Sequence, residues 1–346
     1  MSDNSNFNPN SIGLSSNNIF GLPFSKDDAA LVLLPVPWEV TVSYRIGTAE
    51  SPYHIFEASL QVDLYDADKP NAWKKGIYML PVDENILAIN DDLREKAESV
   101  LTYMVEGGIV EEDEEQSNLL AEVNAGCAIL CDWVYDQTFE LLKEGKKVGL
   151  IGGDHSTPLG YIQALAEFHK DFGILQIDAH ADLRIAYEGF NYSHASIMYN
   201  VLDSVPNVSK LVQVGIRDYC DEELDIINES NGRVKTFFDK DIKKMQYEGA
   251  TWKEICTQIV DSLPQHIYIS FDVDGLDPKL CPNTGTPVPG GFETEQLFYL
   301  LNLIHSSGKE IIGFDLNEVA CGTDDGEGID AIVGARVLYK LCNFII

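Results

Sequence analysis

The stretch Asp178-Ala179-His180-Ala181-Asp182 holds three side chains of types that bind metal ions, spaced two residues apart. It follows an apolar run, residues 173–177, that predicts a short buried strand. In extended backbone the side chains alternate, so the two aspartates and the histidine are predicted to point to the same side. They would then converge at the carboxyl end of a strand, which is where open α/β sheets bind ligands. The stretch therefore predicts a metal site.

Two further strand ends carry side chains of the same kind. His155 follows a Gly-Gly-Asp turn after the predicted strand 147–151, and Asp272 and Asp274 follow the apolar run 266–271. The alternation places Asp272 and Asp274 on one face. Two neighbouring carboxylates repel each other unless one is protonated or a cation lies between them. These strand ends therefore predict additional ligands for the same site.

The proposed site contains four carboxylates and two imidazoles, namely His155, Asp178, His180, Asp182, Asp272 and Asp274. Nitrogen and oxygen ligands without thiolate suit Mn²⁺ and could serve Ni²⁺, Co²⁺ or Fe²⁺. Six ligands exceed what one open catalytic ion needs, whereas two ions that share carboxylates would use them all. A hydroxide between two such ions is a nucleophile at neutral pH. Glu318, at the end of the last predicted strand, could hold a cationic substrate near the metals.

The elements that must position these residues alternate along the chain. Strands are expected near residues 30–37, 76–80, 147–151, 173–177, 211–216, 234–238, 266–271 and 310–316. Helices are expected near residues 52–60, 93–104, 118–144, 157–169, 193–202, 239–247, 251–262, 293–307 and 331–344. This alternation predicts an α/β fold whose mainly parallel sheet is covered on both faces. Residues 1–26 are predicted to be a flexible arm, and residues 27–346 a single catalytic domain.

Composition limits the partners of the protein. The 346 residues carry a formal net charge of −32, with a pI near 4.3. Nucleic acid and anionic membranes would be repelled, whereas a small cationic substrate would be attracted. The seven cysteines are scattered without a CxxC pair, which favours reduced thiols in the cytoplasm. The polar N-terminus does not resemble a signal peptide, and no apolar run reaches membrane-spanning length.

Taken together, the motifs resemble those of the ureohydrolases, the family of arginase, agmatinase and formimidoylglutamase. Gly-Gly-Asp-His-Ser at 152–156, Asp-Ala-His-Ala-Asp at 178–182 and Ser-Phe-Asp-Val-Asp-Gly-Leu-Asp-Pro at 270–278 match in order and spacing, as does the segment 284–291. The resemblance implies a three-layer α/β/α arginase-like fold, a binuclear Mn²⁺ centre, and a homo-oligomer, either a trimer or a hexamer. It implies that one ion is bound by His155, Asp178, Asp182 and Asp272, and the other by Asp178, His180, Asp272 and Asp274.

The same resemblance assigns roles to three more residues. His194 matches the active-site histidine proposed to carry protons to the leaving amine, a role that suits an imidazole because its pKa lies near neutrality. Glu318 matches the carboxylate that pairs with the guanidinium group, and Thr286 matches the threonine that lines the pocket. The implied reaction is attack of a metal-bridging hydroxide on the guanidinium carbon, which releases urea with ammonia or an amine.

The choice of guanidino compound depends on residues around these motifs. Arginases carry an asparagine where this chain has Arg184, and formimidoylglutamases resemble it in carrying arginine there. In contrast, Ser193-His194-Ala195 and the loop 41–48 look more like agmatinases. Near the cavity mouth, Arg184 would disfavour a terminal amine unless Glu188 neutralises it.

Trp38 and the aromatic residues Tyr187, Phe190 and Tyr192 could narrow the pocket and favour a short substrate. Some agmatinase-like members with a long N-terminal arm hydrolyse free guanidine and prefer nickel. Hydrolysis of free guanidine is therefore the predicted activity, and the activities of agmatinase, guanidinobutyrase and formimidoylglutamase are the alternatives. A catalytically inactive metal-binding relative would have lost a ligand, His194 or Glu318, and none of these is missing. A deacetylase of related architecture is disfavoured because it needs only one zinc ion.

Overall fold

A computed structural model of the protein describes residues 7–322 and 328–346. Within these residues, eight strands form one sheet in the order β2-β1-β3-β8-β7-β4-β5-β6, and all neighbouring strands are parallel. The strands are β1 (Leu31–Pro35), β2 (Ile77–Met79), β3 (Lys147–Ile151), β4 (Phe172–Ile177), β5 (Val208–Val214), β6 (Val234–Phe237), β7 (His266–Asp272) and β8 (Glu310–Asn317). The predicted α/β fold with a mainly parallel sheet is confirmed.

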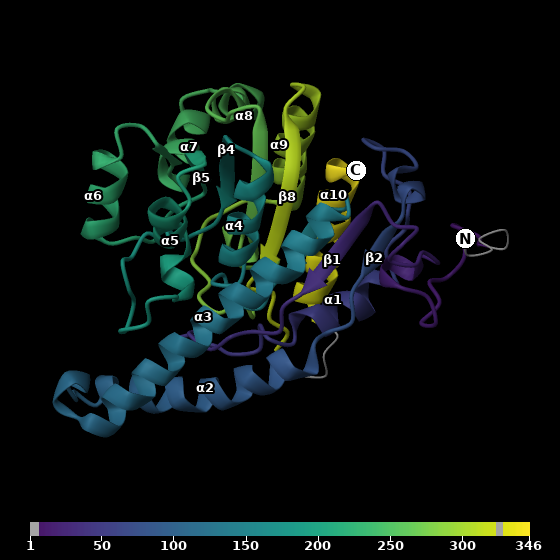
Figure 1. Ribbon diagram of the computed structural model, residues 1–346. Coiled ribbons are helices and arrows are strands. Elements are labelled where there is room, and N and C mark those ends of the chain that lie inside the picture. Colours follow the sequence, from purple (N-terminus) through teal and green to yellow (C-terminus); the bar gives the residue numbers. More distant parts are fainter. Residues whose placement is uncertain (1–6, 323–327) are drawn as a thin grey trace.

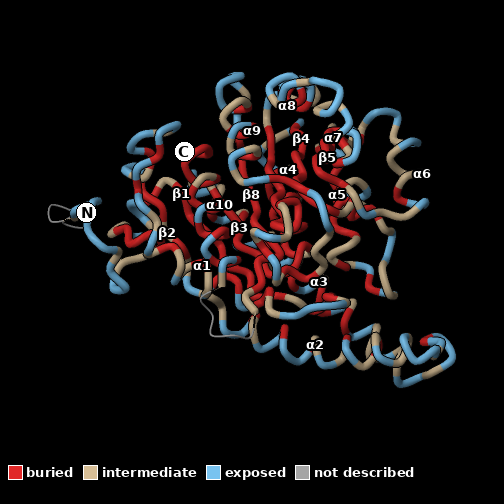
Figure 2. The backbone as a smooth tube through the Cα atoms, turned by 180° about the vertical axis from the view of Figure 1, so that it is seen from behind, coloured by how far each residue is buried: buried red, intermediate tan, exposed pale blue. Residues whose placement is uncertain are grey.

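Helices cover both faces of the sheet (Figures 1 and 2). One face packs against α1 (Ser51–Ser59), α7 (Asp239–Tyr247), α8 (Trp252–Asp261), α9 (Thr294–Ser306) and α10 (Ile329–Ile345). The other packs against α2 (Glu84–Val105), α3 (Glu114–Lys143), α4 (Leu159–Phe168), α5 (Ile197–Ser204) and α6 (Asp221–Glu229). Each helical layer and its face of the sheet enclose one apolar cluster, so the three-layer arrangement is also confirmed.

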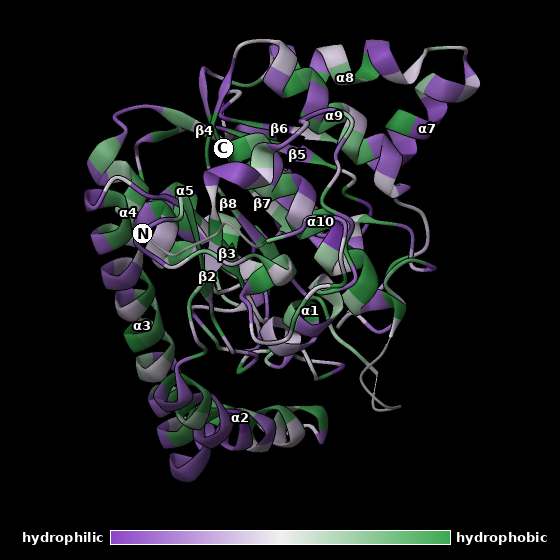
Figure 3. Cartoon of the chain, turned by 90° about the vertical axis from the view of Figure 1, so that its right-hand side faces the viewer, coloured by the Kyte–Doolittle hydropathy of each residue, from purple (hydrophilic) through white to green (hydrophobic). Residues whose placement is uncertain are grey.

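The longest helices, α2 and α3, run side by side and extend beyond the body of the molecule (Figure 1). Hydrophilic residues are prominent on this extension (Figure 3). The acidic segment 111–115 lies at the turn, where Asp113 caps α3 by accepting a hydrogen bond from the backbone N–H of Gln116. Negative side chains are favourable at a helix N-terminus, which explains why this segment begins a helix.

The sequence pattern did not predict α6. This helix is rich in acidic residues, and its apolar residues Leu224, Ile226 and Ile227 are only partly buried, so its apolar face is short. It begins with a reciprocal cap, because the Glu223 carboxylate accepts a hydrogen bond from the backbone N–H of Cys220. The helix thus combines this cap with the packing of Ile226 and Ile227 against the core.

The segment predicted to be an arm is described from Phe7 onward. Its residues Ile19, Phe20 and Leu22 are buried, and the Phe20 ring packs edge-on against Tyr339 at 4.9 Å between centroids. These contacts hold this part of the segment on the body, and the domain boundary at residue 26 stays a prediction. Within the described residues, no helix combines the length and the apolar character that crossing a membrane requires.

Candidate active site and metal centre

The four central strands of the sheet, β3, β8, β7 and β4, deliver the main functional side chains to one edge. Asp272 ends β7, Asp178 directly follows β4, and Glu318 directly follows β8. His155 comes shortly after β3, beyond a glycine pair whose close packing allows the chain to turn: a Cβ on Gly153 would lie 1.8 Å from the Trp38 carbonyl oxygen. The carboxyl ends of adjacent parallel strands thus bring distant parts of the sequence together.

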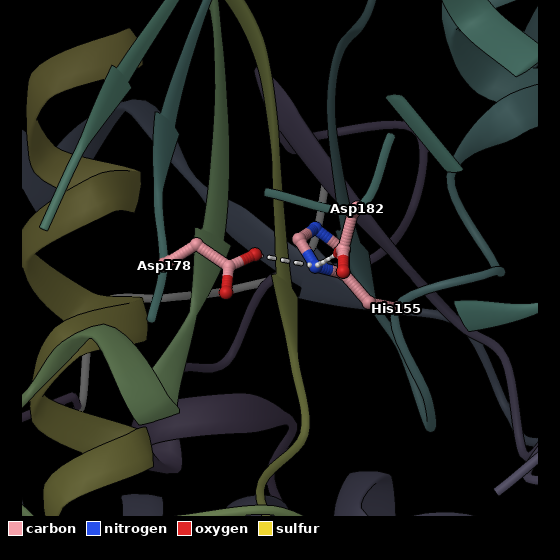
Figure 4. A group of neighbouring side chains, drawn as sticks. All are labelled: His155, Asp178 and Asp182. Atoms are coloured by element: carbon pink, nitrogen blue, oxygen red, sulfur yellow. Dashed lines mark ion pairs between the residues drawn. The ribbon is translucent and has the colours of Figure 1, made fainter. Parts of the chain in front are cut away.

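Two groups of side chains at this edge could each hold a metal ion. In the first, Nδ1 of His155 lies 3.0 Å from Oδ2 of Asp178 and 3.0 Å from Oδ2 of Asp182 (Figure 4). In the second, Nδ1 of His180 lies 2.8 Å from Oδ2 of Asp274 and 3.7 Å from Oδ1 of Asp178. Asp178 belongs to both groups and is placed to bridge two ions.

The three residues of the Asp-Ala-His-Ala-Asp motif were predicted to meet through alternation along one strand. The structure shows that they do not meet in this way. Strand β4 ends at Ile177, and the backbone then turns, with Asp182 in the left-handed region at φ 54°. The Asp178 carboxylate stabilises this turn by accepting a hydrogen bond of 2.7 Å from the backbone N–H of His180. The side chains still converge, but a loop after the strand brings them together.

Asp272, the remaining candidate ligand, lies beside the first group, with Oδ2 3.3 Å from Nδ1 of His155. Its other oxygen accepts a hydrogen bond of 2.8 Å from the backbone N–H of Asp274, which fixes the turn between these two residues. In addition, Asp274 accepts a hydrogen bond of 2.9 Å from the backbone N–H of Ala179, which ties the two aspartate-containing loops together. The structure thus gathers all six predicted ligands.

The negative charges of the clustered aspartates favour binding of a cation. Burial and the neighbouring carboxylates of Asp182 and Asp274 raise the pKa of Asp178 to about 7. Burial and the same kind of repulsion raise the pKa of Asp272 well above its usual range. Burial also opposes ionisation of Asp274, but the adjacent His180 outweighs it and lowers the pKa of Asp274. Divalent ions would relieve the repulsion among these carboxylates.

The tautomer of His155 also fits metal binding. Ser270 donates a hydrogen bond of 3.0 Å to the Asp315 carboxylate, which leaves the Ser270 oxygen to accept from Nε2 of His155 at 2.8 Å. When it is neutral with its proton on Nε2, His155 presents a lone pair at Nδ1, a buried atom without a hydrogen-bond partner. Burial lowers the pKa of His155, but the three facing aspartates outweigh it and raise the pKa well above its usual range. A positive charge between Nδ1 and the carboxylates is thus favoured, and a metal ion can supply it in place of a proton, so these residues fit a metal ion.

Glu318 lies next to the metal cluster and is 6% exposed. One of its oxygens accepts a hydrogen bond of 2.8 Å from the backbone N–H of His155. The other faces Gly285, where a Cβ would approach it to 3.2 Å, so the glycine leaves space beside the carboxylate. Burial, with the nearby charge of Asp154, raises the pKa of Glu318 well above its usual range. A cationic ligand beside this carboxylate would remove the penalty for its ionisation.

His194 is held by a residue to which the sequence assigned no role. The Thr41 oxygen lies 3.3 Å from Nδ1 of His194 and accepts a hydrogen bond of 3.1 Å from the histidine's backbone N–H. Thr41 in turn donates to the buried Asp154 carboxylate at 3.3 Å. Burial lowers the pKa of His194, against the opposing effect of nearby aspartates. The imidazole is therefore neutral at neutral pH and can accept a proton.

These side chains face one cavity of about 440 Å³. Five of the six candidate metal ligands line it, as do His194, Glu318, Thr286 and Arg184, whereas Asp178 lies beneath the surface. The Arg184 guanidinium sits over the Tyr187 ring, 4.6 Å from its centroid. Tyr44 and Arg45 from the loop after β1 are exposed and mark the mouth.

Trp38 does not lie in the cavity wall, which corrects its predicted role in substrate binding. Its side chain is 0% exposed and belongs to the apolar cluster that α2 to α6 cover. Phe190 is buried in the same cluster, so of these aromatic residues it is Tyr187 that reaches the wall. The reason is physical: large apolar rings gain most free energy by complete burial, and the core beneath the loop accommodates them.

Asp218 and Tyr219 also line the cavity, although the sequence interpretation did not include them. They follow β5, and Asp218 is exposed at the wall. The signal that could have found them was available, because the predicted strand 211–216 ends just before them at the edge where the other ligands gather.

The chain matches the Arginase family model over residues 29–343, and it therefore belongs to the arginase family. N(1)-aminopropylagmatine ureohydrolase of Synechocystis sp. is 30% identical over 322 residues, covering 92% of this chain and 89% of that protein. Agmatinase of Blochmanniella floridana is 34% identical over 213 residues, covering 59% and 63% respectively. The crystal structure of agmatine ureohydrolase of Thermoplasma volcanium superimposes with a TM-score of 0.68 at 22% identity, covering 93% of this chain and 92% of the other.

The predicted kinship with the agmatinase-like branch of the ureohydrolases is thus confirmed. The protein is an enzyme of the binuclear metal-dependent hydrolase class that acts on carbon–nitrogen bonds of linear amidines. The two Asp/His groups described above are its candidate metal sites.

Proposed function

We propose that the protein hydrolyses a small guanidino compound to urea and ammonia or an amine. The observation that carries the proposal is the position of Glu318, a buried carboxylate of raised pKa that lines the same cavity as five candidate metal ligands. A guanidinium group is a planar cation whose N–H groups pair with a carboxylate in a fixed geometry. Glu318 is therefore suited to bind and orient the reacting group at the metal centre.

Different side chains of the protein would bind the metal ions or act on the substrate, and we assign a role to each. His155, Asp178 and Asp182 would hold one ion and Asp178, His180 and Asp274 the other, with Asp272 beside the first group. When bound, two divalent ions lower the pKa of water and so supply a nucleophile at neutral pH.

His194 would take up the proton that this water releases and pass it to the leaving nitrogen. Burial favours its neutral, proton-accepting form, and Thr41 holds its ring in place. Thr286 would form part of the wall around the bound guanidinium. The donor set of imidazole nitrogen and carboxylate oxygen suits Mn²⁺ and also Ni²⁺.

Within this class, free guanidine is the proposed substrate. Arg45 and Arg184 both line the cavity near its mouth, where positive charge disfavours the terminal ammonium group of a longer substrate. No ion pair joins Glu188 and Arg184 among the described residues. Burial raises the pKa of Glu188 and the nearby charge of Arg184 opposes this rise, so Glu188 offsets only part of the arginine's charge.

A longer cationic compound is the second candidate. It is favoured by the cavity volume of about 440 Å³, which exceeds what guanidine needs, and by the exposed Asp218 at the wall. The names of two relatives, N(1)-aminopropylagmatine ureohydrolase and agmatinase, point to substrates of this kind.

The test is urea release by protein loaded separately with Mn²⁺ and Ni²⁺. The substrates are guanidine, agmatine, N(1)-aminopropylagmatine, arginine and 4-guanidinobutyrate, with formamide release from formimidoylglutamate in parallel. We expect turnover of guanidine to exceed that of the others, and loss of turnover in Glu318→Gln with metal content retained. Preference for agmatine or N(1)-aminopropylagmatine would establish the second candidate. Absence of turnover with every compound, despite two bound ions, would contradict the proposal.

The assembly and the cellular location are also proposals. We expect a cytoplasmic homo-oligomer, a trimer or a hexamer, and light scattering of the purified protein measures its mass directly against the 38.4 kDa of one chain. A monomer at the concentrations used for assay would contradict this expectation.

A further inference from the structure

A row of polar side chains crosses the sheet directly below the metal residues. Gln176 on β4 is in register with Gln213 on β5, which is in register with Thr236 on β6. Both glutamines are 0% exposed. Two residues earlier on the same strands, the positions on this face are apolar: Ile174, Leu211 and Val234. Buried amides in a sheet core are unfavourable unless each polar atom has a partner, so their partners are informative.

The three side chains form one hydrogen-bonded chain that ends on Asp178. The Thr236 hydroxyl donates to Oε1 of Gln213 at 2.6 Å. Nε2 of Gln213 donates to Oε1 of Gln176 at 2.8 Å, and Nε2 of Gln176 donates to Oδ2 of Asp178 at 2.8 Å. The second N–H of each amide donates to the backbone carbonyl of Ala181, at 2.8 Å, or of His180, at 3.2 Å. Both amides are thus fully satisfied.

The donor and the acceptor in each of these hydrogen bonds can be assigned from the groups that can only accept. The carbonyl oxygen of His180 can only accept, so Gln176 must turn its nitrogen toward it and toward Asp178. The Gln176 oxygen then needs a donor, which Gln213 supplies, and Thr236 must donate to the oxygen of Gln213 in turn. In each of the three hydrogen bonds that link these side chains, the proton therefore points toward Asp178, and aligned hydrogen bonds of this kind polarise and strengthen one another.

We propose that Gln176, Gln213 and Thr236 are positioning residues that orient the Asp178 carboxylate and thereby set the affinity and geometry of the metal centre. This inference rests on the proposed binuclear site, in which Asp178 bridges the two ions. The chain fixes the carboxylate at Oδ2 and also holds the carbonyls of the turn that carries His180 and Asp182. None of the three side chains lines the cavity, so they act through Asp178 and do not touch substrate.

The hydrogen bonds from Thr236 to Asp178 connect an edge strand of the sheet to the proposed metal centre. Because β6 is the last strand of the sheet, Thr236 is only half-buried, whereas the two glutamines lie fully inside. A merely structural role would make the three side chains important for folding and leave metal affinity unchanged. A positioning role predicts graded loss of metal affinity, largest for the residue next to Asp178 and smallest at the edge.

The test measures Mn²⁺ affinity by equilibrium dialysis and the visible absorption spectrum of Co²⁺-loaded protein, independently of turnover. The variants Gln176→Met, Gln213→Met and Thr236→Val remove hydrogen bonds while approximately keeping volume. We expect the Mn²⁺ dissociation constant to rise about 10- to 100-fold in Gln176→Met and roughly threefold in Thr236→Val, with an altered Co²⁺ spectrum in Gln176→Met. Gln213→Met should lie between them.

Controls separate this effect from general loss of a buried polar group. Thr236→Ser keeps the hydroxyl and should restore wild-type affinity. Thr138→Val removes another buried threonine, which bonds the carbonyl of Val134 within its own helix, and should leave Mn²⁺ affinity unchanged. The double variant Gln176→Met/Gln213→Met should bind Mn²⁺ about as weakly as Gln176→Met alone, because residues in one network are not additive.

Unchanged Mn²⁺ affinity in both Gln213→Met and Thr236→Val would overturn the proposal. These two variants also decide the question if Gln176→Met fails to fold. This result is distinguishable from failure of the proposed function. A wild-type protein that binds two ions but hydrolyses no guanidino compound would refute that function. The Mn²⁺ affinities of the variants would still test the role of the hydrogen-bonded row.

Discussion

The floor and the mouth of the cavity are built by different parts of the chain. The floor lies at the ends of the four central strands, and its residues Asp178, His155 and Asp272 are at most 3% exposed. The mouth is formed by loops, and its residues Tyr44 and Arg45 are exposed. Strand ends position the floor, whereas the mouth residues lie on exposed loops. We therefore expect the floor to carry out the chemistry and the mouth to select the substrate.

A substitution in the floor of the cavity should have the largest effect on activity. Asp178→Asn removes the carboxylate that both candidate groups share, and we expect urea release to fall by on the order of 10³-fold, because the proposed nucleophile depends on both ions. Metal analysis should show fewer than two ions per chain. Full activity with two bound ions would contradict the bridging role.

Removing the imidazole of His194 should have the next largest effect without loss of metal. We expect His194→Ala to lower kcat by on the order of 10²-fold, the usual contribution of a proton-transferring group. In the wild type, burial lowers the pKa of His194, so the neutral form persists below the ordinary value of about 6.5 and is lost as the pH falls further. The acid limb of the rate profile that reflects this loss should disappear in the variant.

Thr41 belongs to the same loop as Tyr44 and Arg45, but it contacts His194 inside the cavity. Thr41→Val keeps the shape of the side chain and removes the hydroxyl between His194 and Asp154. Loss of about 1 kcal/mol of hydrogen bonding predicts a roughly fivefold lower kcat. Thr41→Ser should recover the activity. If Ser and Val behave alike, the hydroxyl does not position the histidine.

The smallest effect is expected at the mouth. Arg184→Gln should leave metal content and guanidine turnover almost unchanged, and raise kcat/KM for agmatine by roughly fivefold, because a half-buried cation no longer repels the terminal ammonium. The kcat/KM values of the two substrates are compared in the same preparation. An unchanged ratio would show that Arg184 does not select the substrate.

The same division explains what the sequence could predict. His155, Asp178 and Asp272 follow apolar runs that had to be strands, and parallel strands bring their carboxyl ends to one edge, so the gathering of these residues was predictable. The path of the backbone at Asp182 was not, because a left-handed residue after a strand leaves no signal in the alternation of side chains. The six side chains therefore meet as predicted, but the Asp-Ala-His-Ala-Asp residues do so through a turn and not through alternation.

Features that depend on packing were less predictable. Trp38 stands near the motifs in sequence, but its ring is in the core and not in the wall, because neighbouring positions along a loop can face opposite ways. The helix α6 is short, and its few apolar residues stand among acidic ones, so the sequence pattern did not reveal it. The chain from Thr236 to Asp178 joins three strands, and only their register places these side chains in line.

The most direct test of the account is the position of the ions themselves. Crystals of Mn²⁺-loaded protein, measured with anomalous diffraction at the manganese edge, should show two peaks in each chain. One should lie among His155, Asp178 and Asp182, and the other among Asp178, His180 and Asp274. A single peak, or two peaks that are not both next to Asp178, would contradict the binuclear metal site on which the proposed mechanism depends.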